Sequence, residues 1–263
     1  CDSLRRRLSR NPILMLKNLT GKTDFVTGGA HGIGRGIVEA LRLAGARTAF
    51  CDTNTELGEA TARAAGADFY PADVADADAL RNALEAACER FGDVDILVNN
   101  AGISEFSPLA ETSLEQFDHI LAVNLRPVFV TAQWMAARRN TPEGRTRYGR
   151  IINIASTRWL QSEPGSEGYA ASKGGIVSLT HALALSFSDY NVTVNCISPG
   201  WIDNGNFGSI SEQDRRQHPS GRIGRPADIA RACLFLANPK NDFIDGQNLV
   251  VDGGMTKKMI YCE

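Results

Sequence analysis

The sequence has few of the residues that build metal sites or disulfide frameworks. Its 263 residues include only four histidines and six cysteines, and the cysteines are scattered, with no Cys-x-x-Cys spacing. Structural zinc sites need Cys or His ligands at short spacing, and secreted disulfide scaffolds are small and rich in cysteine. We therefore expect no metal, and a reducing, cytoplasmic location.

Long hydrophobic runs and an excess of charge are also missing. No apolar run approaches the ~20 residues of a membrane-spanning helix, and the formal net charge is only −2. A nearly neutral chain has no global field that would attract nucleic acid. We expect neither a membrane nor a nucleic acid as partner. The hydrophobic content of 43% is enough for a sizeable core.

The first residues differ from the rest of the chain. Residues 1–14 contain no methionine and carry the run Arg5-Arg6-Arg7, whereas Met15 is a more natural start. We expect residues 1–14 to be a non-native or disordered extension; the alternative is an Arg- and Ser-containing targeting remnant. Residues 15–263 are then a single domain.

Short apolar segments alternate with longer amphipathic ones. The apolar segments predict seven strands, at Thr23–Thr27, Arg47–Cys51, Ala67–Tyr70, Asp95–Val98, Arg150–Ala155, Val192–Ile197 and Asn248–Val251. The intervening segments predict helices, at Gly32–Ala44, Thr55–Ala65, Asp76–Arg90, Ser113–Ala122, Leu125–Arg139, Gly168–Asp189 and Pro226–Ala237. This order predicts an α/β fold: one doubly wound, Rossmann-like domain whose seven-stranded parallel sheet has helices on both faces.

Two polar segments interrupt the pattern. Residues 140–149 are rich in arginine and predict a surface loop. Residues from about 204 to 221 follow a strand's carboxyl end, where such folds bind ligands. We therefore expect the second segment to be a lid.

A glycine-rich turn joins the first predicted strand to the first predicted helix. Gly28, Gly32 and Gly34 give the spacing Gly-x-x-x-Gly-x-Gly, with His31 and Ile33 among them. Glycines let the backbone approach a pyrophosphate closely, and a helix start offers free N–H groups and the positive end of its dipole. We expect these five residues to bind a dinucleotide cofactor.

An acidic residue ends the second predicted strand. Asp52 lies about 20 positions past the glycines, where a carboxylate can accept hydrogen bonds from an adenosine ribose. The same carboxylate would repel a 2′-phosphate, and no arginine follows it. This favours NAD over NADP, although the basic His31 could help to hold a phosphate. Asp52 could instead simply begin a turn.

Tyr169 and Lys173 lie four residues apart in a predicted helix, and Ser156 follows the strand before it. Residues four apart share one helix face, so the ammonium lies next to the phenol. A free phenol has a pKa near ~10, and a neighbouring cation lowers that pKa. Ser156 could share a substrate oxygen with Tyr169. This combination predicts an enzyme, although Tyr-x-x-x-Lys alone would also suit an ordinary amphipathic helix.

An ordered set of motifs extends from about Gly21 to Gly254. It consists of TGGAHGIG at 27–34, Asp73-Val74, Asn99-Asn100-Ala101-Gly102, Asn124, Ser156, YAASK at 169–173, Pro199-Gly200 and VDGG at 251–254. In these motifs the chain resembles the short-chain dehydrogenase/reductase family, in its NAD-preferring type. The resemblance implies an oxidoreductase that transfers a hydride between NAD and a secondary alcohol or ketone.

The resemblance also implies a catalytic tetrad of Asn124, Ser156, Tyr169 and Lys173. Tyr169 would exchange the proton of the substrate oxygen, and Ser156 would orient that oxygen. Lys173 would lower the pKa of Tyr169 and bind the nicotinamide ribose, so Tyr169 and Lys173 also count as cofactor residues. Asn124 would hold a water that links Lys173 to solvent.

Further cofactor contacts follow from the same resemblance. Asp73 and Val74 would contact the adenine, Asn100 would line the cofactor cleft, and Ile202 would contact the nicotinamide amide. Asn204 stands where the family commonly has a threonine, and its amide can also donate and accept hydrogen bonds. The spacing from Asn124 to Ser156 is longer than usual, which the 140–149 insertion would account for.

Arg158, Trp159 and Trp201 are the candidate substrate residues, with Phe106 nearby in the pocket. Their mixed character suits a secondary alcohol or ketone of moderate size, and steroids, sugars or polyols, and 3-oxoacyl thioesters all stay open. Arg158 could pair with an anionic substrate, or with Glu163 or Glu167.

Three other functions compete with an NAD-dependent dehydrogenase. They are an NADP-dependent 3-oxoacyl thioester reductase, a non-catalytic nucleotide-sensing protein on the same fold, and a Rossmann-like methyltransferase. A complete Asn-Ser-Tyr-Lys set argues against the last two. By resemblance we also expect a homodimer or homotetramer.

Overall fold

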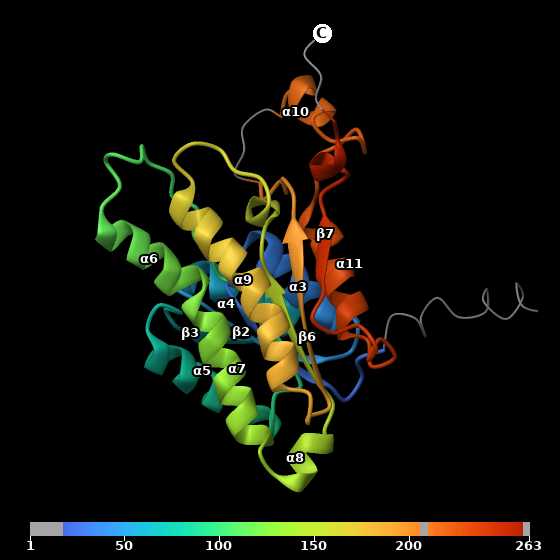
Figure 1. The fold of residues 1–263 in the computed structure, drawn as a ribbon. Coiled ribbons are helices and arrows are strands. Elements are labelled where there is room, and N and C mark those ends of the chain that lie inside the picture. The colour runs from blue at the N-terminus through green and yellow to red at the C-terminus, as the bar shows by residue number, and fades with distance from the viewer. Residues whose placement is uncertain (1–17, 206–209, 260–263) are drawn as a thin grey trace, which may run out of the picture.

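A computed structural model describes residues 18–205 and 210–259 (Figure 1). Its centre is a seven-stranded parallel sheet with the order β3-β2-β1-β4-β5-β6-β7. The strands are β1 (Thr23–Thr27), β2 (Arg47–Asp52), β3 (Asp68–Pro71), β4 (Ile96–Asn99), β5 (Gly149–Ile154), β6 (Val192–Pro199) and β7 (Asn248–Val251). The predicted strand number, direction and fold class are confirmed.

Successive residues of the central strands enter two separate cores. Phe25 of β1 pairs with Leu97 of β4, and both belong to one core; the next pair, Val26 and Val98, belongs to the other. Because strand side chains alternate between the two faces, a strand buried on both faces must be apolar throughout. Each fully buried side chain of this size contributes about 1.5–3 kcal/mol.

Helices cover both faces of the sheet. The first core holds residues of α5 (Ala77–Phe91), α7 (Arg126–Arg139) and α9 (Glu167–Ser186), which lie in front of the sheet in Figure 1. The second holds residues of α3 (Gly32–Leu43) and α11 (Pro226–Ala237), and α4 (Thr55–Ala65) packs against it. The remaining helical elements are α6 (Leu114–Asn124), α8 (Pro142–Thr146), α10 (Glu212–Arg216) and the 3-10 turns η1 (Thr157–Trp159) and η2 (Met255–Lys257).

The direction in which successive strands are added to the sheet reverses at β1, while all strands stay parallel. From β1 the chain builds outward through β2 to β3, and it then returns to place β4 on the other side of β1. In open α/β sheets ligands bind beyond the carboxyl ends of the strands at such a switch point. The glycine loop follows β1 and Asn100 follows β4, so both lie at this point.

Among the described residues, Leu114–Arg139 alone has the length and apolar composition that could cross a membrane. The structure splits this stretch at Leu125 into α6 and α7. More than half of its apolar window is buried, where it packs against α5, α9 and β4. Packing within the protein therefore accounts for its apolar character.

The surface loop expected at residues 140–149 contains regular secondary structure. The segment 140–149 is not wholly a loop, because Thr141 caps the short helix α8 through the Gly144 N–H, and Gly149 already belongs to β5. The pattern was missed because a helix of five residues has no measurable periodicity. The proposed 1–14 extension lies outside the described residues.

Candidate active site

The glycine loop leaves the start of α3 open. His31 is the N-cap residue, but within the described residues α3 has no side-chain capping hydrogen bond, and its first turn carries no acidic residue. The first N–H groups of a helix have no partners within it, and with the positive dipole end they attract anions. A β-carbon on Gly34 would lie 1.9 Å from the Gly28 carbonyl oxygen, so a side chain there would push loop and helix apart.

Asn100 fixes this loop to the end of β4. Its side-chain amide donates to the carbonyl oxygens of Thr27 (3.0 Å) and Gly28 (2.8 Å). The Thr27 hydroxyl in turn accepts from the N–H groups of Asn100 and Ala101. Asn100 therefore shapes the glycine loop from behind, and its role toward a cofactor stays a prediction.

Asp52 is buried and holds the loop from the β2 side. One carboxylate oxygen accepts from the Ala30 N–H (3.0 Å) and the other from the Asn54 N–H (3.0 Å). The second contact is the turn role that the sequence left open. Each carboxylate oxygen can accept a further hydrogen bond, so the geometry still allows contact with a ribose.

Asp73 and Val74 follow β3 at the same edge of the sheet. The Asp73 carboxylate accepts from the Ala75 N–H (2.8 Å), which forms the turn leading into α5, while Val74 is buried. Asp73 thus fulfils a local structural role, and the contact with adenine stays a prediction.

Ile202 and Asn204 follow β6 and approach the glycine loop. Ile202 is buried and forms a parallel bridge with Gly224. A β-carbon on Gly32 would lie 3.1 Å from the Asn204 side chain. The glycine loop and the segment after β6 are therefore in close proximity, and the contacts of Ile202 and Asn204 with a cofactor stay predictions.

Ser156 and Tyr169 meet as predicted. The Ser156 side chain lies near enough to Tyr169 to influence its pKa, and the Ser156 hydroxyl accepts a hydrogen bond from the Arg158 N–H (3.2 Å). Ser156 lies just past β5 and Tyr169 in the first turn of α9, so two elements bring the hydroxyls together. Burial raises the pKa of Tyr169 above its usual value, while the nearby Ser156 hydroxyl and the charge of Arg158 act to lower it.

The expected effect of Lys173 on Tyr169 is not found in this structure. The Lys173 ammonium lies 5.5 Å from the centre of the phenol ring and donates to the Ile154 carbonyl oxygen (2.9 Å). Complete burial lowers the pKa of Lys173 itself to about 8. Helical spacing places Lys173 beside Tyr169, but its ammonium donates to the main chain of β5, so its effect on the pKa of Tyr169 stays a prediction.

Asn124 fixes the loop after β4 from the other side. Its amide oxygen accepts from the Ile103 N–H (2.8 Å), and its nitrogen donates to the Ile103 carbonyl and the Ser172 hydroxyl, each at 3.0 Å. A β-carbon on Gly102 would lie 3.1 Å from the Asn124 oxygen and 3.5 Å from Lys173 Nζ. Asn124 therefore lies next to Lys173 and joins α6 to α9.

Of the candidate substrate residues, Arg158 and Trp159 lie beside the tetrad. The Arg158 guanidinium pairs with Glu163 (2.5 Å) and lies 5.0 Å from the centre of the Phe106 ring. Phe106 packs edge-on against Tyr169, with 5.9 Å between ring centres. Trp159 is partly exposed in η1. The sequence left Glu163 open as a partner of Arg158, and the structure confirms it.

The lid expected at about 204–221 is only partly free of the domain. Its end is anchored, because Ser220 N–H donates to Gly253 (3.0 Å) and the His218 side chain is buried near Trp201, with 6.4 Å between the rings. The lid also contains α10, whose Arg216 carbonyl accepts from Lys258 (2.8 Å). Part of the lid, residues 206–209, lies outside the described residues.

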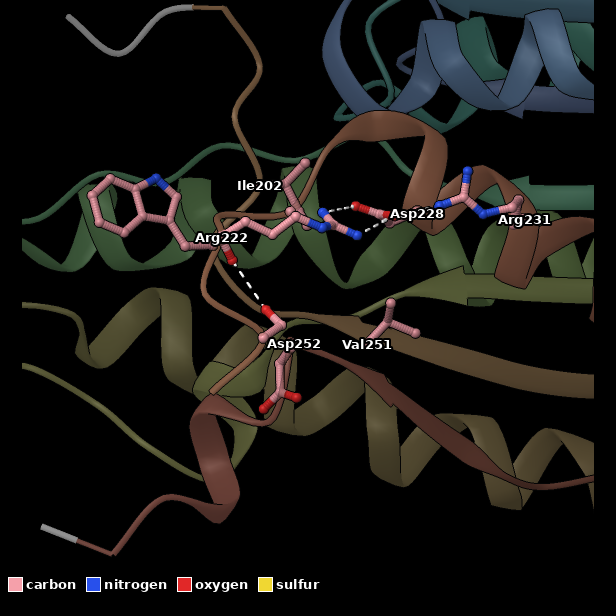
Figure 2. A pocket seen from close by; sticks show the side chains of 10 residues that line it. Ile202, Arg222, Asp228, Arg231, Val251 and Asp252 are labelled. Carbon is pink, nitrogen blue, oxygen red and sulfur yellow. Dashed lines mark hydrogen bonds and ion pairs between the residues drawn. The ribbon is translucent and has the colours of Figure 1, made fainter. Parts of the chain in front are cut away.

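A cavity of about 280 Å³ lies between the lid, α11 and the end of β7 (Figure 2). Asp228 lines the cavity and forms a bidentate ion pair with Arg222 (2.7 and 2.9 Å). A second ion pair joins Asp228 to Arg231. Trp201 and Ile202 line it, but no residue of the tetrad does. The acid/base groups therefore lie outside this cavity.

Several contacts of the site could not be found from the sequence. Phe106, Arg158 and Tyr169 come from three separate segments, and their stacking depends on how two loops fold over the sheet. The role of Ser172 as a partner of Asn124 carries no sequence signal either, since both residues occur at ordinary helical positions.

Comparison with known proteins identifies many relatives. Residues 28–256 match the family model described as enoyl-(acyl carrier protein) reductase. An uncharacterized oxidoreductase of Thermotoga maritima is 42% identical over 93% of this chain and all of its own length. The reductase FabG of Chlamydia muridarum, named for 3-oxoacyl-[acyl-carrier-protein], is 34% identical over 90% of this chain and 98% of its own. D-threitol dehydrogenase of Mycolicibacterium smegmatis is 37% identical over 91% and 95%.

Solved structures give the same result. The apo SCOR enzyme from Clostridium thermocellum superposes with a TM-score of 0.82 at 41% identity, covering 91% of this chain and 95% of its own. A mutant of the short-chain dehydrogenase/reductase from Serratia marcescens gives a TM-score of 0.82 at 38% identity, covering 91% and 99%. Together with the fold and the motifs, these matches show that the chain belongs to the short-chain dehydrogenase/reductase family.

Proposed function

We propose that this oxidoreductase transfers a hydride between NAD and a secondary alcohol or ketone. The observation that carries the proposal is that Ser156, Tyr169 and the buried Lys173 lie together, at the edge of the sheet that holds the glycine loop. The bound nicotinamide would supply or accept the hydride. The open start of α3 would bind the pyrophosphate of NAD, and Asp52 would accept hydrogen bonds from its adenosine ribose.

The protein's own residues would handle the proton. In alcohol oxidation Tyr169 in its phenolate form accepts the hydroxyl proton of the substrate and becomes a neutral phenol; in ketone reduction the neutral phenol donates its proton to the substrate oxygen and becomes a phenolate. Ser156 orients the same oxygen through its hydroxyl. Lys173 holds a positive charge close to the phenol, and Asn124 keeps the α6 end and the loop after β4 in place around it.

A substrate panel tests the proposal. Purified protein is mixed with NAD or NADP and a series of secondary alcohols, and reduced nicotinamide is followed by its absorbance. We expect turnover with at least one secondary alcohol and a preference for NAD. Binding of either nicotinamide without turnover of any alcohol or ketone would instead favour a nucleotide-sensing role.

Asp52 tests the cofactor preference. The Asp52→Ala substitution removes a carboxylate that would repel a 2′-phosphate, so we expect the ratio of kcat/KM for NAD to that for NADP to fall by about 10-fold or more. Glu56→Ala, in the first turn of α4, is the control for loss of a nearby charge. An unchanged ratio in Asp52→Ala would contradict the ribose role.

An NADP-dependent 3-oxoacyl thioester reductase is the second candidate. It is favoured by the FabG relative, whose name states such a substrate, and by the exposed His31 in the glycine loop. The threitol dehydrogenase relative favours a polyol instead. The same panel, extended to a 3-oxoacyl thioester with NADPH, separates these candidates.

The setting of the reaction is also proposed. Cys51, Cys88, Cys196 and Cys233 are free and buried, which suits a reducing cytoplasm. Exposed apolar side chains on α7 and α9, Phe129 and Leu185, favour a homodimer or homotetramer. A small-molecule substrate remains the proposed partner, with no nucleic acid or membrane.

A further inference from the structure

The Arg158–Glu163 pair lies in the segment that connects the two hydroxyl groups of the proposed catalytic site. Ser156 begins this segment and receives the Arg158 N–H, and Tyr169 follows it in α9. Glu163 is held near the segment's end, where its carbonyl oxygen accepts from the Ser166 hydroxyl (2.6 Å). The pair therefore lies in the chain between the two groups that would contact the substrate oxygen.

The guanidinium is also fixed in orientation. It lies over the Phe106 ring at 5.0 Å, and that ring packs against Tyr169. A planar cation over an aromatic face gains a favourable electrostatic contact, so Arg158 is held on both sides. Its position beside Phe106 places a charged pair near the phenol of Tyr169.

Most hydrogen-bonding capacity of this pair is left over. In the part of the chain that the structure describes, the Arg158 guanidinium has one side-chain acceptor, Glu163 Oε1. A guanidinium has five N–H donors and a carboxylate about four acceptor positions. The side chains of Arg158 and Glu163 are 27% and 52% exposed, so the unused donors and acceptors are open to solvent or ligand.

The unused donors of Arg158 and acceptors of Glu163 favour some classes of substrate over others. A hydroxyl group both donates and accepts, so it matches a site that offers Arg donors beside Glu acceptors. An anionic substrate would have to compete with Glu163 for the same cation. An apolar acyl chain would remove water from two charges and return no hydrogen bonds, which is unfavourable.

We propose that the Arg158–Glu163 pair binds a second hydroxyl group of the substrate and so selects a polyol or sugar alcohol. The inference rests on the proposed hydride transfer at Ser156 and Tyr169 and specifies its substrate. The partly exposed faces of Phe106 and Trp159 would contact the carbon chain.

Steady-state kinetics with two groups of alcohols test this inference. Threitol, xylitol and sorbitol carry neighbouring hydroxyl groups, whereas 2-butanol and cyclohexanol carry one. Arg158→Met should lower kcat/KM for the polyols about 10- to 100-fold, because a hydrogen bond from a charged group is lost. Loss of the Arg158 charge also removes an influence that lowers the pKa of Tyr169, which affects every alcohol alike, so kcat/KM for the polyols should fall at least about 10-fold more than kcat/KM for the single alcohols. Arg63→Met, which removes the exposed Arg63–Glu59 pair on α4, is the matched control.

Glu163→Gln separates hydroxyl binding from anion binding. The amide keeps an acceptor and adds donors, so polyol turnover should stay within about 5-fold of the unsubstituted protein. A site for anions would instead gain activity on a hydroxy acid such as 3-hydroxybutyrate, since Arg158 loses its competitor.

The outcomes distinguish this inference from the proposed function. Equal loss on both groups of alcohols in Arg158→Met, or turnover of single alcohols, hydroxy acids or thioesters but of no polyol, would overturn the inference and leave hydride transfer intact. Absence of turnover with every compound would overturn both. Unchanged thermal unfolding of each variant shows that a kinetic loss is not caused by misfolding.

Discussion

At the scale of single residues, burial of the charged Lys173 side chain lowers the stability of the folded protein. Its ammonium is buried and has one hydrogen-bond acceptor in the described residues, the Ile154 carbonyl oxygen. Burial disfavours the charged form, which lowers the pKa of Lys173 from 10.5 to about 8. At neutral pH the lysine is still mostly charged, so the protein retains a cation here at the expense of stability.

Stability should therefore depend on pH through Lys173. Between about pH 8 and 10.5 the unfolded chain binds this proton more strongly than the folded one, so the free energy of unfolding rises with pH. Relative to Lys173→Met, which has no such proton, the unsubstituted protein should gain at most about 3 kcal/mol across this range. Below pH 8 the difference between the two proteins should be constant.

Urea unfolding of both proteins from pH 7 to 10.5 measures this difference directly. The comparison cancels the titration of tyrosines and cysteines that both proteins share. A difference that stays flat from pH 7 to 10.5 would mean that Lys173 is solvated, contrary to its burial in the structure.

At the scale of elements, the glycine loop and α3 are packed so closely that Gly34 leaves no room for a side chain. A β-carbon on Gly34 would meet the Gly28 carbonyl oxygen at 1.9 Å and the Asn100 amide at 2.5 Å. Gly174 in α9 is a matched contrast, since a β-carbon there would meet no atom within 4 Å. The same Gly→Ala change should thus have opposite effects at the two positions.

Gly34→Ala should destabilise the protein by about 1–3 kcal/mol, the usual cost of overpacking, and weaken nicotinamide binding at least 10-fold. Gly174→Ala should stabilise it by about 0.5–1 kcal/mol, because alanine favours a helix interior. Chemical denaturation gives both free energies, and fluorescence titration with NADH gives binding. If Gly34→Ala were as stable as Gly174→Ala, the close packing of loop and helix would be refuted.

The strands and helices could be predicted from the sequence, whereas contacts between distant segments could not. The two-sided apolar strands and the helix between each pair predicted the sheet, since period and length carry that information locally. The helical spacing of Tyr169 and Lys173 placed them together, and the end of β5 brought Ser156 to them. The direction of the Lys173 ammonium, the anchoring of His218 and the Arg158–Phe106–Tyr169 stack depend on contacts between distant segments, which no local pattern encodes.

At the scale of the whole molecule, exposed apolar side chains remain on α7 and α9, two helices of the layer in front of the sheet. Phe129 of α7 is 51% exposed and Leu185 of α9 is 77% exposed. α7 and α9 are neighbours in that layer. Large exposed apolar side chains on adjacent helices favour burial against a second copy of the chain.

The double substitution Phe129→Asp and Leu185→Asp should shift the protein toward monomer, since it would place charges in an apolar interface. Size-exclusion chromatography with light scattering measures the mass of both proteins. Leu43→Asp, at a similarly exposed position on α3, is the control. A monomeric unsubstituted protein, or an oligomer that survives the double substitution, would contradict this assembly.

The central claim is that Tyr169 exchanges the proton in a nicotinamide-dependent reaction, and Tyr169→Phe tests it most directly. The substitution removes one hydroxyl group and keeps the ring that packs against Phe106. With the best alcohol of the panel, the account predicts a loss of turnover of at least about 100-fold, the usual contribution of a positioned acid or base, with NAD binding within about 3-fold of the unsubstituted protein. Turnover above a few per cent in Tyr169→Phe would contradict it.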